Sequence, residues 1–209
     1  MTKQQQVLDA AIRVLGTGGM RQLTHRAVDT EAGLPQGSTS NHFRTRDALI
    51  TGVLGRILER ETALWAGLAG DGTTPGVTTP DGTTPDGTTP DGTTPNVTPD
   101  GTPDAFARTV GALIERLAAD PAVTLARHAL LVEVAQRPEL RPEVERAHRE
   151  IAGWAVPLIA ALGSSDPPAD LAVLLGLIDG LLANHLANPR RDFDPTAAVR
   201  RVLRGILAG

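Results

Sequence analysis

Apolar residues recur at helical spacing along most of this chain, and this periodicity restricts its fold more than any other feature. Val7, Leu8, Ala11, Ile12 and Leu15 form one apolar face, and Gly16 to Gly19 are expected to end that helix. Similar patterns follow over residues 24–33, 46–69, 104–119, 122–136, 139–162, 169–187 and 195–207. No segment shows the strict alternation of a half-buried strand. The sequence therefore predicts an all-α fold.

One segment breaks the helical pattern. From residue 71 to residue 103 the chain repeats short units such as TTPDG. Proline at every fourth or fifth position prevents a helix, and Asp-Gly pairs favour isolated turns. We expect a low-complexity loop over residues 70–103.

Composition excludes several classes of site. The chain has 209 residues, of which 41% are hydrophobic, enough for a substantial core, and it has no cysteine. Disulfides, thiolate catalysis and cysteine-based zinc sites are therefore excluded. Asp9 and Arg13 interrupt the apolar residues near the N-terminus, which therefore resembles neither a secretion signal nor a membrane span. We expect a cytoplasmic protein that does not interact with membranes.

The net charge of −4 is unevenly distributed. Residues 1–60 contain eight Lys and Arg against five Asp and Glu, whereas the rest of the chain contains twelve against nineteen. A basic N-terminal part on an acidic body fits a module that binds a polyanion.

Two short helical segments, 24–33 and 35–42, are separated by a turn at Gly33 and have the form of a helix-turn-helix. The second segment is unusually polar: Gln36, Ser38, Ser40 and Asn41 could exchange hydrogen bonds with base edges and phosphates, and Gly37 would allow close backbone approach. The alternative is an ordinary solvated loop between two helices. This segment alone leaves both interpretations open.

The order T-x-R-A-V-x-x-x-A-G-L-P-x-G-S-x-x-x-H-F-x-x-R-x-x-L, from Thr24 to Leu49, resembles the DNA-binding domain of TetR-family transcriptional regulators. The tail, LIDGLLANHL followed by DFDPTAAVRRVLRGIL, is similar to the last two helices of that family, which form its dimer interface. The resemblance implies a three-helix DNA-binding domain over residues 1–48. Residues 49–209 would then form a helical domain for ligand binding and dimerisation.

The resemblance also assigns roles to individual residues. The residues that would face the DNA are Arg26, Gln36, Gly37, Ser38, Ser40 and Asn41. Those that would contact phosphates are Thr24, His25, His42 and Arg46. Phe43 and Leu49 would pack the recognition helix onto the domain. Two residues depart from the family pattern, because Pro35 stands where a capping Ser is frequent and Ser40 where a Tyr is frequent.

The motifs of common enzymes are missing, since the chain contains no G-x-S-x-G and no H-E-x-x-H. We therefore expect no catalytic activity, no cofactor and no metal. Polar residues in otherwise apolar helices are the candidates for binding a small molecule: Arg127, His128, Trp154, Asn184 and His185. For each of them, a structural role in the core or at an interface is the competing interpretation.

The almost wholly apolar segment 169–187 needs cover on all sides, which predicts a homodimer through the last two helices. Together these features predict a homodimeric transcriptional repressor that leaves a palindromic operator when a small-molecule effector binds. The alternative function is a helical bundle that binds small molecules or partners and whose N-terminal domain does not bind DNA. The effector, the operator sequence and the role of the repeat are not predicted.

Overall fold

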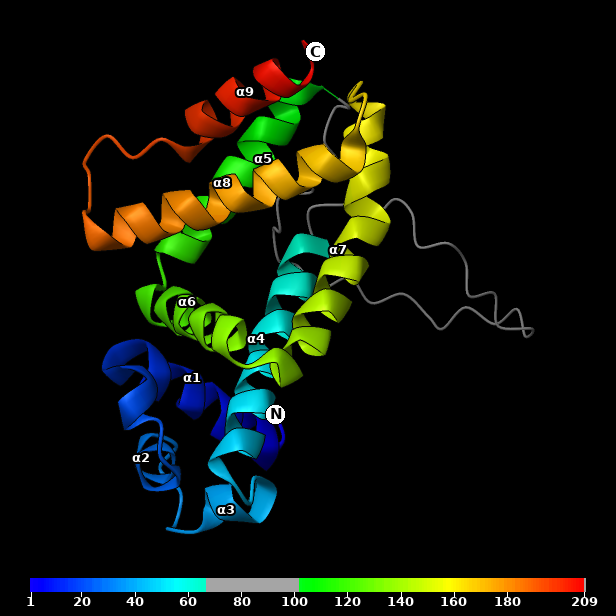
Figure 1. The fold of residues 1–209 in the computed structure, drawn as a ribbon. Coiled ribbons are helices and arrows are strands. Elements are labelled where there is room, and N and C mark those ends of the chain that lie inside the picture. Colours follow the sequence, from blue (N-terminus) through cyan, green and yellow to red (C-terminus); the bar gives the residue numbers. More distant parts are fainter. Residues whose placement is uncertain (67–101, 209) are drawn as a thin grey trace, which may run out of the picture.

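In the computed structural model, which describes residues 1–66 and 102–208, the described chain consists of α-helices and one short 3-10 turn (Figure 1). The described ranges contain no strand, so the predicted all-α fold is confirmed. The helices are α1 (Lys3–Gln22), α2 (His25–Glu31), α3 (Ser38–His42), α4 (Arg46–Ala66), α5 (Pro103–Ala118), α6 (Pro121–Gln136), α7 (Arg141–Ala161), α8 (Pro167–Ala187) and α9 (Pro195–Ile206), with η1 (Pro138–Leu140) before α7. Most of the expected loop over 70–103 lies outside these residues, and its last residue, Pro103, already begins α5.

Side-chain caps fix where many of these helices begin. Thr24 accepts a hydrogen bond from the backbone N–H of Ala27 at the start of α2, at 3.2 Å. Four more helices, α5, α6, α8 and α9, are capped in the same way, by Thr102, Asp120, Asp166 and Asp194 respectively. Each of these four helices has proline in its first turn. Both features satisfy or remove backbone N–H groups that have no partner inside the helix.

Gly16 to Gly19 were predicted to end the first helix, and the helical geometry does break at Gly19 (φ 70°, ψ −179°). Beyond this kink a short helical segment continues to Gln22, so α1 as a whole is longer than predicted. Gly16 instead marks a helix crossing. A Cβ atom at Gly16 would lie 1.9 Å from the carbonyl oxygen of Ala122 in α6. The missing side chain therefore lets the backbones of α1 and α6 touch, and α6 is the helix on which α1 packs most extensively.

The buried apolar residues form two clusters. The first joins α1, α2 and the first part of α4 to α6 and the start of α7, with Ile12, Leu23, Ile50 and Leu130 among its fully buried members. The second joins α5, α7, α8 and α9. Figure 1 shows α4 running from the α1–α3 end of the molecule along α7 toward α8, so α4 reaches both clusters.

Helix α8 is only partly covered within one chain. Among the described residues it is the helix long and apolar enough to cross a membrane by length and composition, and only 22% of its most apolar window is buried. Val173, on the uncovered side, is 52% exposed. An apolar face of this kind on a helix that also packs on α5, α7 and α9 is typical of an interface between subunits.

Candidate nucleic-acid interface and ligand cavity

A buried carboxylate holds the turn between α2 and α3. Asp29, which is 2% exposed, accepts hydrogen bonds from the backbone N–H groups of Gly37 (2.8 Å) and Thr39 (2.7 Å) and from the Thr39 hydroxyl (2.5 Å). Gly37 has φ 91°, in the left-handed region that other residues rarely adopt. Together Asp29 and Gly37 determine where α3 begins, and Asp29 was not among the residues predicted from the sequence.

Burial by itself would raise the pKa of Asp29, because it disfavours the charged form. The hydrogen bonds from Thr39 and Gly37 outweigh burial, and the positive charge of His25 acts in the same direction. The net result is a pKa below the ordinary value of 3.8. Asp29 is therefore a stably ionised cap of α3.

The residues predicted to face DNA lie around α2 and α3, at the end of the molecule away from α9 (Figure 1). Most of these residues are exposed: Thr24, Arg26, Gln36, Gly37, Ser40, Asn41, His42 and Arg46. Ser38 and His25 are half-buried. Between them, Thr39 is fully buried against Asp29, so one side of α3 is fixed while its polar side faces solvent.

Several of these side chains already have partners within the protein. The Nε2 atom of His25 lies 2.6 Å from the carbonyl oxygen of Phe43, so it must carry the proton and donate it. The other ring nitrogen can then donate to a phosphate only when the imidazole is protonated. Arg46 donates to the carbonyl oxygen of Met20 at 2.6 Å. Its other N–H groups have no partner among residues 1–66 and 102–208, so they can donate to a phosphate.

Phe43 and Leu49 are buried, at 7% and 0% exposure, in the core that supports α3. Gly52 makes room for the Phe43 ring, because a Cβ atom there would lie 2.5 Å from it. These contacts agree with the packing role that the family resemblance gives to Phe43 and Leu49.

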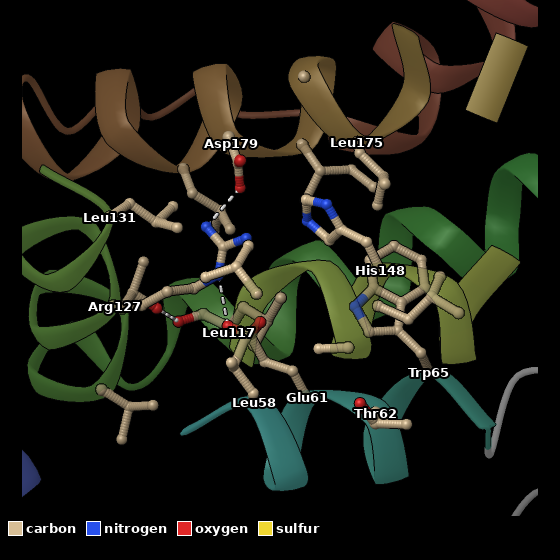
Figure 2. A pocket seen from close by; sticks show the side chains of 18 of the residues that line it. Leu58, Glu61, Thr62, Trp65, Leu117, Arg127, Leu131, His148, Leu175 and Asp179 are labelled. Atoms are coloured by element: carbon tan, nitrogen blue, oxygen red, sulfur yellow. Dashed lines mark hydrogen bonds and ion pairs between the residues drawn. The ribbon is translucent and has the colours of Figure 1, made fainter. Parts of the chain in front are cut away.

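A second candidate site is a cavity of about 300 Å³ in the body of the protein (Figure 2). Its walls come from α4, α5, α6, α7 and α8, and most of the lining is apolar, including Leu58, Leu117, Leu131 and Leu175. Cavities of this size and character bind small molecules.

One arginine bridges two carboxylates in the wall of this cavity. The Nε atom of Arg127 lies 2.5 Å from Glu61, and its Nη1 atom lies 2.5 Å from Asp179. Figure 2 shows the guanidinium of Arg127 between these two acids, which come from α4 and α8. The side chains of Glu61 and Arg127 are mostly buried, whereas that of Asp179 is 37% exposed.

Burial raises the pKa of Glu61 above its ordinary value of 4.5. Arg127 opposes this shift, but the nearby negative charge of Asp179 adds to it. A single arginine therefore does not fully compensate two carboxylates in this mostly apolar environment. A buried carboxylate with a shifted pKa inside a cavity is a frequent feature of binding sites.

Two tryptophans extend the cavity toward α5. Trp65 lines the cavity of Figure 2 and also an adjoining, mostly apolar pocket that contains Trp154. The two ring centroids are 6.4 Å apart and the planes are inclined by 35°. The Nε1 atom of Trp154 is buried and has no hydrogen-bond partner among the described residues.

The structure groups only some of the residues predicted to bind a ligand. Arg127 lines the main cavity and Trp154 lines the adjoining pocket. His128 lies beside Arg127 but directs its nitrogens to the carbonyl oxygens of Thr124 (2.8 Å) and Asp179 (3.4 Å).

Asn184 and His185 lie nearer the C-terminal end of α8 and line a different depression. His185 stacks on Phe193, with ring centroids 3.9 Å apart, and Asn184 donates to the carbonyl oxygen of Gly180. Neither residue lines the cavity that contains Arg127.

Glu61, Trp65 and Asp179 were not predicted as ligand-binding residues, although the sequence contains a signal for two of them. Glu61 follows Ile57 by four positions and Asp179 follows Leu175 by four, so both acids continue an apolar helix face. A charged residue at such a core-facing position indicates a buried polar site. In the described parts of the chain, no cluster of three or more His, Asp or Glu side chains is arranged to hold a metal ion.

Comparisons with known proteins match both sites to one family. Residues 7–53 match the model of bacterial regulatory proteins of the tetR family, and residues 101–209 match the model of the tetracyclin repressor-like C-terminal domain. A comparison with curated protein sequences finds no match.

Solved structures resemble the chain over nearly its whole length. A member of the TetR family from Streptomyces coelicolor is 26% identical, with a TM-score of 0.65 and coverage of 99% of this chain and 98% of that one. The multidrug binding protein EbrR, complexed with ethidium, is 25% identical, with a TM-score of 0.60 and coverage of 98% and 97%. A transcriptional regulator from Rhodococcus has the same fold at 19% identity, with a TM-score of 0.71 and coverage of 100% and 97%.

Proposed function

This chain belongs to the TetR family of bacterial transcriptional regulators, and on that premise we propose which of its residues bind the operator and which bind the effector. The protein is a DNA-binding transcriptional repressor that acts as a homodimer, with a C-terminal ligand-binding domain. The family is regulatory and not catalytic. We further propose that the protein works in the cytoplasm, where operator DNA is found, and that it has no enzymatic activity.

The exposed polar side of α3, held in place by Asp29, is the observation that carries the DNA-binding proposal. Gln36, Ser40 and Asn41 reach base edges in the major groove, together with the exposed Arg26 of α2. Thr24, His42 and Arg46 contact phosphates on either side, and His25 joins them when its ring is protonated. Gly37 and Ser38 place the start of α3 close to the DNA backbone.

The test is selection of bound sequences from a randomised duplex library by the full-length protein at two salt concentrations. Two copies of α3 in a symmetric dimer should enrich a palindrome whose half-sites are about one helical turn apart. Binding should weaken steeply with salt because phosphate contacts release counterions. A library without enrichment would instead support a helical ligand-binding bundle whose N-terminal domain does not bind DNA.

Two variants separate phosphate contacts from base contacts. Arg46→Ala should weaken binding to every duplex by a similar factor and lower the salt slope by about two, one for each subunit of the dimer. Asn41→Ala should mainly relax base preference at one position in each half-site. Equal effects of both variants on specificity and salt slope would contradict this assignment.

We propose that the effector occupies the cavity lined by Glu61, Trp65, Arg127 and Asp179. Helix α6 supports this assignment, because it carries Arg127 in the cavity wall and also packs against α1 of the DNA-binding domain. The similar protein EbrR is a multidrug binding protein whose structures hold ethidium or proflavin, which favours a small-molecule effector here as well. A bound effector would move α6 and so change the spacing of the two α3 helices.

The division into two domains follows from these roles. We propose a DNA-binding domain over residues 1–48 and a regulatory and dimerisation domain over residues 49–209. The continuous helix α4 joins them, with Leu49 and Ile50 in the first core cluster and Glu61 in the cavity wall. Dimer contacts involve α8 and α9, where α8 leaves an apolar face uncovered.

A further inference from the structure

We propose that the effector of this protein is a small organic cation with a flat apolar body, whose positive charge lies against Glu61 and Asp179 and whose body lies against Trp65. This inference rests on the proposal that the cavity of Figure 2 binds the effector. It adds the chemical class of that effector, which the family membership does not specify.

The charge balance of the described lining is the first argument. Three charged side chains line the cavity: the acids Glu61 and Asp179 and the base Arg127. With the acids ionised, their sum is one negative charge, and the remaining ionisable side chain of the lining is the exposed His148. A ligand with one positive charge would neutralise the site.

Residues 67–101 cannot supply the missing positive charge. That segment follows α4, which forms one wall of the cavity, but its sequence contains five aspartates and neither lysine nor arginine. The sequence of residues 67–101 therefore adds no positive charge to the balance of the described lining.

The buried position of Glu61 strengthens the attraction of this net negative charge for a cation. Glu61 is 9% exposed, and the raised pKa of its carboxyl group agrees with incomplete compensation by Arg127. Charge interactions are stronger in a mostly apolar cavity than in water, so a cation that enters gains from both carboxylates. An anion would have to displace Glu61 or Asp179 from Arg127, leaving a carboxylate without its partner.

The apolar part of the ligand follows from the tryptophans. Trp65 lies in the wall of the main cavity and next to Trp154 in the adjoining pocket. An indole face attracts both flat rings and cations. Because the volume of about 300 Å³ is near the lower end for ligand sites, the ligand is expected to be about the size of three fused rings.

The experiment compares three probes that share one ring system: N-methylacridinium, which is a cation, neutral acridine, and acridine carboxylate, which is an anion. Trp65 and Trp154 are the two tryptophans of the whole chain, so quenching of tryptophan emission reports binding at these cavities. All three titrations use the same mildly alkaline buffer, in which an ordinary imidazole is uncharged.

We expect N-methylacridinium to bind about tenfold more tightly than acridine, and acridine carboxylate to bind most weakly of the three. Glu61→Gln removes one negative charge and keeps an oxygen that can accept from Arg127. This variant should lose the preference for the cation while its affinity for neutral acridine stays within about twofold, which shows that the cavity is intact. Glu145→Gln is the matched control, because Glu145 is exposed on α7 and does not line the cavity.

Equal affinities for the three probes, or an unchanged preference for the cation in Glu61→Gln, would overturn the inference and leave the effector cavity itself standing. No quenching by any probe would overturn both the charge inference and the assignment of the cavity. Neither result bears on operator binding, which the library selection tests separately. If Glu61→Gln fails to fold, Asp179→Asn gives the same comparison at the more exposed acid.

Discussion

Two buried carboxylates, one in each region of the molecule, have opposite properties. Asp29 in the DNA-binding domain is 2% exposed, accepts three hydrogen bonds and has a lowered pKa. Glu61 in the body is 9% exposed, shares a single arginine with Asp179 and has a raised pKa. Both side chains have little contact with solvent, but Glu61 lies deeper in the protein, so burial acts more strongly on its pKa. The hydrogen bonds of Asp29 outweigh burial, whereas Arg127 does not outweigh it at Glu61.

This difference indicates what each region is built to do. A fully satisfied carboxylate stabilises the folded state and fixes the position of α3 before DNA arrives. An incompletely compensated carboxylate costs stability and is retained at a site where a ligand completes it. The start of α3 is therefore held by hydrogen bonds in the free protein, whereas the cavity is held in a less favourable electrostatic state until it is occupied.

The largest expected effect is the loss of the Asp29 carboxylate. Asp29→Ala leaves two backbone N–H groups and the Thr39 hydroxyl without their acceptor, which should lower the free energy of unfolding by about 3 kcal/mol. Denaturant titration measures this loss. The control is Glu31→Ala on the same helix, which removes only an exposed pair with Arg13 and should cost less than about 0.5 kcal/mol. Similar losses in both variants would show that Asp29 has no special role.

The crossing of α1 and α6 should give the next largest effect. Gly16→Ala places a methyl group 1.9 Å from a backbone oxygen of α6, so the helices must separate, at a cost of about 2 kcal/mol. The shift should also weaken operator binding, since α6 connects the cavity to α1.

Gly55→Ala in α4 is the matched control. A Cβ atom there meets nothing within 4 Å, so the better helix propensity of alanine should stabilise the protein by roughly 0.5 kcal/mol. A Gly16→Ala variant as stable as Gly55→Ala would contradict the close approach of α1 and α6.

The smallest change in the free energy of unfolding is expected for Glu61→Gln. Whether this variant is more or less stable than the wild-type protein decides what Glu61 does. Glu61→Gln removes a buried negative charge while Arg127 keeps its contact with Asp179. We expect the free energy of unfolding at neutral pH to stay the same or rise by up to about 1 kcal/mol. Thermal unfolding without ligand measures this change, and a clear loss of stability would show that Glu61 is a structural residue.

The same contrast explains how far the sequence predicted the structure. The DNA-binding domain is assembled from neighbouring segments, so local signals such as the Thr24 cap placed α2 correctly. The segment predicted over 35–42 is helical only from Ser38 to His42. Asp29 was missed because its partners depend on the left-handed turn at Gly37, which residue types alone do not reveal. The break of α1 at Gly19 was expected, but the contact of Gly16 with Ala122 was not, because Ala122 is distant in sequence.

The cavity was harder to predict because its residues come from five helices. Arg127 stood out as a charge in an apolar helix, but its partners lie 66 positions earlier in α4 and 52 positions later in α8. Asn184 and His185 carried the same kind of signal, and the structure places them at another depression. Helical periodicity shows which side of a helix is buried, and it does not show which helices meet there.

The most direct test of this account is the unfolding free energy of the wild-type protein, Asp29→Asn and Glu61→Gln, measured by denaturation from about pH 3 to about pH 7. Because folding lowers the pKa of Asp29, its contribution is fully present above the ordinary value of 3.8 and is lost as pH falls through the folded pKa. The deficit of Asp29→Asn should therefore shrink in acid.

Because folding raises the pKa of Glu61, the wild-type protein should lose stability relative to Glu61→Gln as pH rises from the ordinary value of 4.5 through the folded pKa. The account predicts opposite signs for the two variants at neutral pH, with Asp29→Asn less stable and Glu61→Gln equally or more stable than the wild-type protein. Losses of similar size in both variants would contradict the claim that one carboxylate stabilises the fold and the other is kept for a ligand.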